Sequence, residues 1–143
     1  MIIKLEINHK TSSYEVSPGD SLLSVLRSNG YFGAKFGGCK SGECGACTVL
    51  MDGKPVNSCS LLAAKAEGHR IETIEGIGEN PEQGWKKTTG FSKLQQEFIK
   101  SGAIQCGYCT PAMILAAKSL LDKEEAPTEE QIRDSISGVL CRC

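Results

Sequence analysis

Eight cysteines are the residues of this chain whose type and spacing most directly suggest chemistry. They form two groups of four, separated by 46 residues without a cysteine: Cys39, Cys44, Cys47 and Cys59, then Cys106, Cys109, Cys141 and Cys143. The alternating polar and apolar residues of 1–6 are untypical of a signal peptide, so we expect a reducing compartment, where cysteines more often bind metal than form disulfides. Because four thiolates complete one closed site, the count predicts two metal sites with no cysteine left over.

The first group has the spacing C-x4-C-x2-C-x11-C, which begins as the plant-type ferredoxin signature does. Structural zinc sites normally combine two short cysteine pairs, whereas here three cysteines share one loop and the fourth stands apart. Four of the eleven residues at 37–47 are glycine, which readily adopts the backbone angles that turn N–H groups toward cluster sulfurs. This pattern predicts a binuclear iron–sulfur cluster, with zinc or disulfides as the alternatives.

The second group, C-x2-C-x31-C-x-C, is less specific on its own. Two distant cysteine pairs can bind zinc, although the C-x-C half and the long gap are unusual for such a site. A C-x2-C pair can also be a thioredoxin-like dithiol, but that interpretation leaves Cys141 and Cys143 without a role. The spacing alone therefore leaves more than one kind of site open.

The elements expected around the first group form a small α+β unit. Apolar and polar residues alternate over 2–8, which predicts a half-buried strand, and a second alternating strand is expected around Tyr14. Asp20 or Ser21 caps a short helix. Further elements are predicted as strands at 48–51, 56–59 and 71–74, a hairpin turn at Asp52-Gly53 and a short helix at 60–67.

The rest of the chain is predicted to be helical after a linker at 77–90, where Trp85 would anchor the segment to a domain. Capping-box patterns open helices at Ser92 and Thr128. Thr110, which precedes a proline, is the expected N-cap of another helix that is apolar nearly all round and therefore buried. The second cysteine group then lies at the start of one helix and past the end of another, which antiparallel packing would bring together.

Four stretches carry a family resemblance: Gly38-Cys39-x-x-Gly42-x-Cys44-Gly45-Ala46-Cys47-Thr48-Val49, Cys59, Gln105-Cys106-Gly107-Tyr108-Cys109-Thr110-Pro111 and Leu140-Cys141-Arg142-Cys143. In this order they resemble the small iron–sulfur subunit of the molybdenum hydroxylases, the family of xanthine dehydrogenase and aerobic carbon monoxide dehydrogenase. The chain departs from the family pattern at Ala112, where relatives have glycine, and at Val139, where they have asparagine. Relatives also continue past Cys143, and because a terminal carboxylate beside a cluster ligand would be unfavourable, we expect the natural chain to continue as well.

The resemblance implies an N-terminal plant-ferredoxin-like β-grasp domain at 1–76, a linker at 77–90 and a C-terminal all-α helical-bundle domain at 91–143. It implies one [2Fe–2S] cluster in each domain, bound by Cys39, Cys44, Cys47 and Cys59 in the first and by Cys106, Cys109, Cys141 and Cys143 in the second. It also implies that Gln105 and Cys143 lie against the molybdopterin cofactor of a partner subunit.

The implied function is electron transfer by a non-catalytic subunit of a molybdenum-containing oxidoreductase. Electrons would pass from the molybdopterin of a large subunit through both clusters to FAD in a medium subunit or to an external acceptor. The cluster of the helical domain would lie nearer the molybdopterin and that of the ferredoxin-like domain nearer the flavin. The implied assembly is a dimer of heterotrimers in the cytoplasm.

The composition argues against nucleic-acid binding, membrane spanning and catalysis by this chain. With 16 Lys and Arg against 17 Asp and Glu, the net charge is −1, which lacks the basic excess of nucleic-acid-binding proteins, and no apolar run approaches a membrane span. His9 and His69 belong to no catalytic pattern, so no catalytic residue is expected. A free-standing two-cluster ferredoxin is the alternative function, but this charge provides little of the electrostatic steering that a diffusing carrier uses.

Overall fold

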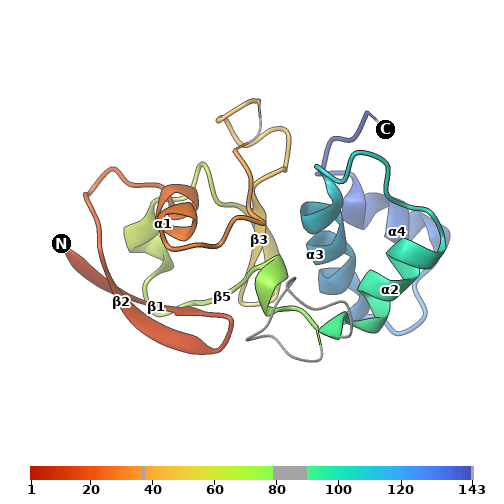
Figure 1. Cartoon of the computed structure of the whole chain (residues 1–143), viewed down its shortest axis with the longest axis horizontal. Helices are drawn as coiled ribbons and strands as arrows, with labels where there is room; N and C mark the ends of the chain where they lie inside the picture. Colours follow the sequence, from red (N-terminus) through yellow and green to blue (C-terminus); the bar gives the residue numbers. More distant parts are fainter. Residues whose placement is uncertain (37, 79–89, 143) are drawn as a thin grey trace.

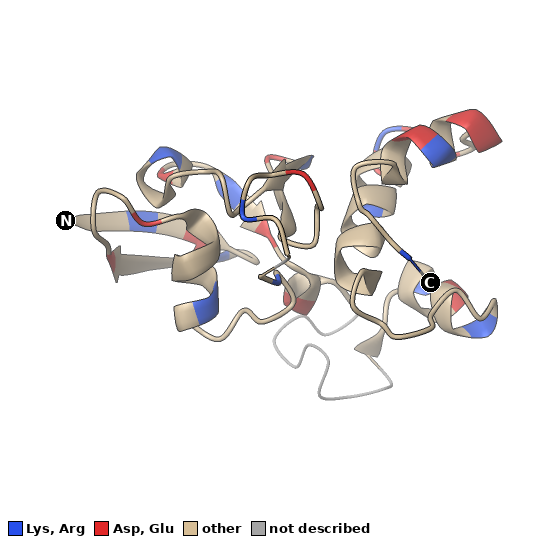
Figure 2. Ribbon diagram, turned by 90° about the horizontal axis from the view of Figure 1, so that it is seen from above, with Lys and Arg blue, Asp and Glu red and all other residues tan. Residues whose placement is uncertain are grey.

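The computed structural model of the chain describes residues 1–36, 38–78 and 90–142, and the predictions for Trp85, Cys143 and the linker residues 79–89 lie outside these ranges. A half that contains a sheet lies beside a helical half (Figure 1). Acidic and basic residues occur on both halves (Figure 2). The arrangement confirms the predicted α+β fold.

The first half is a five-stranded mixed sheet with one α-helix packed on it. In the order β2-β1-β5-β3-β4, the strands are Lys10–Glu15, Ile2–Ile7, Arg70–Glu72, Thr48–Met51 and Lys54–Asn57. Strands β1 and β5 are parallel, and the other neighbours are antiparallel. Helix α1 (Leu22–Ser28) begins at Ser21, whose hydroxyl accepts the N–H of Ser24 and so satisfies one of the helix's free donors.

The core of this half fills the space between α1 and the sheet. Ile3, Leu5 and Ile7 of β1 point into it, as their alternation predicts, and are almost fully buried. Leu22 and Leu26 of α1 belong to the same cluster. Burial of each such side chain stabilises the fold by roughly 1.5–3 kcal/mol. This core therefore holds α1, and with it the start of the loop that follows α1, against the sheet.

The helix predicted at 60–67 is wrong in extent and type. The structure has only a short 3-10 helix there, η1 (Ala63–Ala66). Leu62 stays extended because it forms an isolated β-bridge with Ser21 at the start of α1. Tertiary pairing thus prevents a longer helix in this segment.

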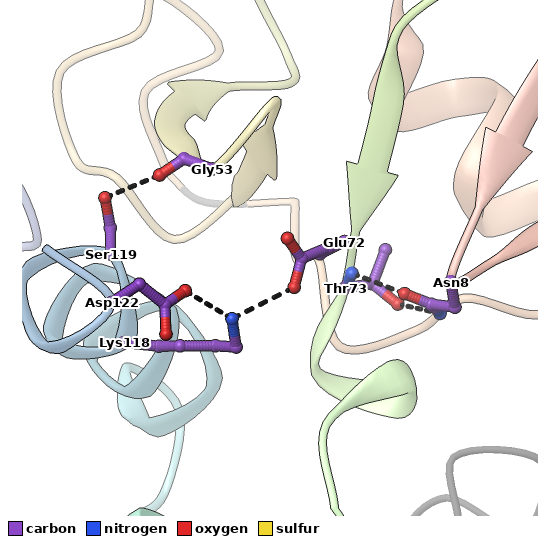
Figure 3. A network of polar contacts seen from close by, with 7 residues as sticks. All are labelled: Asn8, Gly53, Glu72, Thr73, Lys118, Ser119 and Asp122. Carbon is purple, nitrogen blue, oxygen red and sulfur yellow. Dashed lines mark hydrogen bonds and ion pairs between the residues drawn. The ribbon is translucent and has the colours of Figure 1, made fainter.

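Two predicted strands also differ in their limits. The strand predicted at 71–74 ends at Glu72, because the N–H of Thr73 bonds the side-chain oxygen of Asn8 (Figure 3). A 3-10 helix, η2 (Ile74–Gly76), follows. The strand predicted at 56–59 begins directly after the hairpin turn and ends at Asn57, which leaves Cys59 outside the sheet.

The second half consists of α2 (Lys93–Lys100), α3 (Thr110–Leu121) and α4 (Glu129–Ile136). The capping boxes predicted at Ser92 and Thr128 are both present. The N-cap of α3 is Cys109 and not Thr110, because the Cys109 backbone is already helical and its carbonyl accepts the N–H of Met113. Helix α3 therefore starts directly at a cysteine of the second group.

Strand β3 joins the two halves because it is buried on both faces. Val49 belongs to the core under α1, whereas Leu50 packs with Ile77, Ile114 and Leu115 between the sheet and α3. Val49 and Leu50 have no solvent exposure. Ile77, the first residue of the predicted linker, is therefore part of a core that both halves share.

Polar contacts close the same interface near the C-terminal end of α3 (Figure 3). The Ser119 hydroxyl donates to the Gly53 carbonyl at 2.7 Å, and Lys118 Nζ lies 3.2 Å from Glu72 and 2.5 Å from Asp122. Burial by itself lowers the pKa of Lys118, but hydrogen bonds to Asp122 and Glu72 outweigh it and raise the pKa. The lysine is therefore charged at neutral pH and links α3 to β5.

Leu50→Ala is expected to destabilise the chain by about 2–5 kcal/mol, because it opens a cavity in the core that both halves share. The matched control is Ile2→Ala: Ile2 lies in the same sheet but is 73% exposed, so its truncation should change stability by no more than about 0.5 kcal/mol. Thermal unfolding of the purified variants measures both effects. Equal unfolding midpoints would contradict the shared core.

Candidate metal centres

The first cysteine group converges in the loop between α1 and β3 and in the segment after β4. The sulfur atoms of Cys39 and Cys44 are 3.3 Å apart. The thiol of Cys47, directly before β3, hydrogen-bonds with that of Cys59. Burial, followed by the Cys47 thiol, raises the pKa of Cys59, although the N–H of Gly42 acts in the opposite direction. The charge of Cys39 also acts on Cys59, so the structure places the two pairs of this group near each other.

Backbone N–H groups of the first loop point at its sulfurs. The sulfur of Cys39 accepts the N–H of Cys44, at 3.3 Å, and those of Ser41 and Glu43. These backbone donors, followed by the Cys44 thiol, lower the pKa of Cys39 to about 6. The loop therefore favours the thiolate, which is the form of cysteine that binds iron.

The second group lies around the start of α3 and beyond the end of α4. The thiols of Cys109 and Cys141 hydrogen-bond with each other, and burial, followed by this neighbour, raises the pKa of Cys109 to about 11. Cys106 lies near enough for its charge to act on Cys109, and its sulfur accepts the N–H of Tyr108 at 3.5 Å. The three described members of this group are thus together, and Cys143 lies outside the described residues.

These thiols approach one another in pairs, which fits a binuclear cluster. The pairs are Cys39 with Cys44, Cys47 with Cys59, and Cys109 with Cys141. Within 1–36, 38–78 and 90–142, no three His, Cys, Asp or Glu side chains gather as the ligands of a single ion would. Cys39, Cys44, Cys47, Cys59, Cys109 and Cys141 form no disulfide. Four thiolates hold the two irons of a [2Fe–2S] cluster, two for each iron, so paired sulfurs are the expected donor set.

The two cysteine loops touch directly. The N–H of Leu140, beside Cys141, donates to the carbonyl of Cys44 at 2.9 Å. Gly45 has a φ of +72° and packs so closely that a Cβ atom on it would lie 2.1 Å from the Gly138 carbonyl oxygen. Both facts require glycine at position 45. Sequence reasoning located the loops but missed this contact, although a glycine directly after Cys44 is a signal that could have indicated it.

Gln105, the residue expected to contact the pterin, precedes Cys106 in the exposed turn that leads into α3. It is exposed and directly precedes the first cysteine of the second group. Its position is therefore compatible with contact to a partner that approaches the second loop.

Comparisons with known proteins establish the family. Residues 5–73 match the family described as "2Fe-2S iron-sulfur cluster binding domain", and residues 73–143 match the family described as "[2Fe-2S] binding domain". The nicotinate dehydrogenase small FeS subunit of Eubacterium barkeri is 45% identical over 141 residues, which cover 99% of this chain and 85% of the relative. The chain belongs to the small iron–sulfur subunits of the molybdenum hydroxylases.

Two further matches agree with this membership. The xanthine dehydrogenase iron-sulfur-binding subunit of Escherichia coli O157:H7 is 44% identical over 143 residues, which cover 99% of this chain and 84% of the relative. The crystal structure of quinoline 2-oxidoreductase from Pseudomonas putida 86 contains a chain with a TM-score of 0.89 and 40% identity, over 100% of this chain and 83% of that one. The iron–sulfur subunit fold is therefore shared along the whole length of this chain.

Family membership confirms the predicted function. The chain is a non-catalytic, electron-transfer subunit of an oxidoreductase complex, it binds two [2Fe–2S] clusters, and it works with larger partner subunits. In the part of the chain that the structure describes, no helix combines the length and the apolar character that crossing a bilayer requires.

Cys44→Ser is expected to remove one of two rhombic EPR signals of the reduced protein and to leave the other, because the two cysteine groups bind separately. Cys109→Ser is the reciprocal variant and should remove the other signal. EPR of the dithionite-reduced, iron-loaded proteins measures both. Loss of both signals from either single variant would contradict two independent sites.

Proposed function

We propose that Cys39, Cys44, Cys47 and Cys59 hold one [2Fe–2S] cluster and that Cys106, Cys109, Cys141 and Cys143 hold the other. The ferredoxin-like domain comprises 1–76, the linker 77–90 and the helical domain 91–143. The observation that carries this proposal is the approach of thiols in pairs within two loops that touch. Each cluster supplies a site for one electron at a time, and this chain's own part is to hold the two sites at a fixed separation.

We further propose that the helical domain faces the large, molybdopterin-binding subunit and that the ferredoxin-like domain faces FAD in a medium subunit or an external acceptor. Exposure supports the first assignment: Cys106 and Cys141 are exposed, whereas Cys47 is buried and the other cysteines of the first group are half-buried. The second loop is therefore the more accessible of the two to a docked partner. The assembly is a dimer of heterotrimers in the cytoplasm.

Exposed apolar side chains around the second loop support docking of the large subunit there. Leu140, directly before Cys141, is 67% exposed, and Ile104 and Tyr108 on either side of Cys106 are also exposed. Side chains of this kind lose unfavourable contact with water when a partner covers them. We call Ile104, Tyr108 and Leu140 the docking residues.

Gln105 and Cys143 are proposed to lie against the pterin of the docked subunit. Gln105 is exposed between two docking residues in sequence, so a partner that covers these residues also covers the glutamine. Its amide can both donate and accept hydrogen bonds, which suits the mixed donor and acceptor edge of a pterin. The glutamine would orient the pterin relative to the second cysteine group.

Leu140→Lys is expected to weaken binding of the large subunit by about 30-fold, because a charge would be buried in an apolar contact worth ~2 kcal/mol or more. Leu121→Lys is the matched control: Leu121 is also exposed but lies at the opposite end of α3 from Cys109. Recovery of the large subunit on a tagged chain measures both. Equal recovery with both variants, each still carrying two clusters, would contradict docking at the second loop.

Gln105→Ala is expected to slow reduction of the clusters by substrate about tenfold in the assembled complex, as loss of one positioning hydrogen bond would. Reduction by dithionite should be unchanged. Gln96→Ala, which removes a hydrogen bond to the Phe91 carbonyl within the helical domain, serves as the control. Stopped-flow absorbance follows the clusters, and a wild-type rate for Gln105→Ala would contradict the pterin contact.

A further inference from the structure

Tyr108 joins the two cysteine loops through its side chain. It lies between Cys106 and Cys109 in the second loop, yet its hydroxyl donates to the carbonyl of Phe36, which precedes the first loop. The ammonium of Lys35 also lies over its ring, 5.0 Å from the ring centroid. One hydrogen bond and one cation–π contact therefore fix the tyrosine against the sheet half.

The segment that receives Tyr108 is held in place by Arg27 of α1. The Arg27 guanidinium donates to the carbonyls of Phe32, at 3.1 Å, and of Ala34, at 2.8 Å. It also lies over the rings of Phe32 and Phe36, 5.5 and 5.1 Å from their centroids. These contacts give the segment 32–36 a defined position relative to the core under α1.

The same segment is bonded to the first cysteine loop. The backbone N–H of Lys35 donates to the carbonyl of Ala46 at 3.1 Å, and Ala46 directly precedes Cys47. The carbonyl that accepts the Tyr108 hydroxyl is thus one residue from a backbone bond to the first loop. A movement of Tyr108 relative to the sheet half would therefore also move the second loop relative to the first.

We propose that Tyr108 is a positioning residue that sets the separation and relative orientation of the two clusters. The proposal rests on the ligand sets proposed above. The Leu140–Cys44 bond and the Gly45–Gly138 contact join the loops through backbone atoms, whereas the tie made by Tyr108 is a side-chain contact that one substitution can remove. Because transfer of an electron from one cluster to the other slows steeply with distance, a side chain that fixes their spacing serves the function directly.

The test is Tyr108→Phe in the full, iron-loaded chain, since this change removes the hydroxyl and keeps the ring. When both clusters are reduced, the magnetic dipole of each splits the EPR signal of the other, and the splitting depends on their distance and orientation. We expect the variant to show a shifted or broadened splitting with both signals at their wild-type integrated intensity. A splitting identical to that of the wild type would overturn the proposal.

Ser119→Ala is the matched control. It also removes a hydroxyl bond between the two halves, but this bond lies roughly 15 Å along α3 from Cys109. We expect the splitting of this variant to equal that of the wild type. If Ser119→Ala changed the splitting as much as Tyr108→Phe does, the whole interface and not Tyr108 would set the spacing, and the proposal would fail.

Hydrogen exchange supplies a readout that does not depend on the clusters. The N–H of Leu140, bonded to Cys44 across the loops, should exchange faster in Tyr108→Phe and at the wild-type rate in Ser119→Ala. If the Leu140 N–H exchanged at the wild-type rate in Tyr108→Phe, Tyr108 would not hold the two loops together, and the proposal would be overturned even if a cluster failed to load. A wild-type protein without two interacting EPR signals would instead contradict the proposed ligand sets, and the exchange rate of Leu140 would still decide the role of Tyr108.

Discussion

The close packing of Gly45 against Gly138 is the constraint on which the rest of the structure depends. It brings a backbone that carries Cys44 against a backbone that carries Cys141, which no side chain at position 45 would permit. For this contact to exist, the helical half must sit directly on β3. The apolar cluster around Leu50 packs α3 against the sheet. Near the C-terminal end of α3, Ser119 and Lys118 add polar contacts with the sheet half. These contacts join the sheet half and the helical half on both sides of β3.

The two cysteine loops act differently on the charge of their thiols. The first loop aims several backbone N–H groups at one sulfur, and these donors favour the negative form of Cys39. The second places Cys109 at the N-cap of α3, where the helix dipole favours negative charge. Burial acts against the thiolate at Cys109 and Cys59, and bound iron would offset this cost by bonding the sulfur. Each loop thus suits a metal-bound thiolate better than a free one.

Local sequence patterns predicted local structure well. Ile3, Leu5 and Ile7 alternate into the core, and the boxes at Ser92 and Thr128 cap helices, because these features depend only on neighbouring residues. The sequence patterns predicted the wrong structure where contact with a residue far away in the chain determines the backbone conformation. Leu62 is held extended by Ser21, which shortens the helix predicted around it.

The contact between the halves could be predicted only in part. The uninterrupted apolar run of β3 is typical of a strand buried on both faces, but the run does not tell which element covers the second face. The contacts of Tyr108 with Phe36 and of Leu140 with Cys44 join residues far apart in the chain, and no spacing rule connects them. Ala112 and Val139, far apart in the chain, are buried in one small cluster with Ala116.

The most direct test of the account is the metal content of the purified full chain together with its EPR spectrum after stepwise reduction. Two [2Fe–2S] clusters require four irons and four acid-labile sulfides per chain and two rhombic signals, each integrating to one spin. A colourless protein with stoichiometric zinc, or a chain with iron for only one cluster and a single signal, would contradict it.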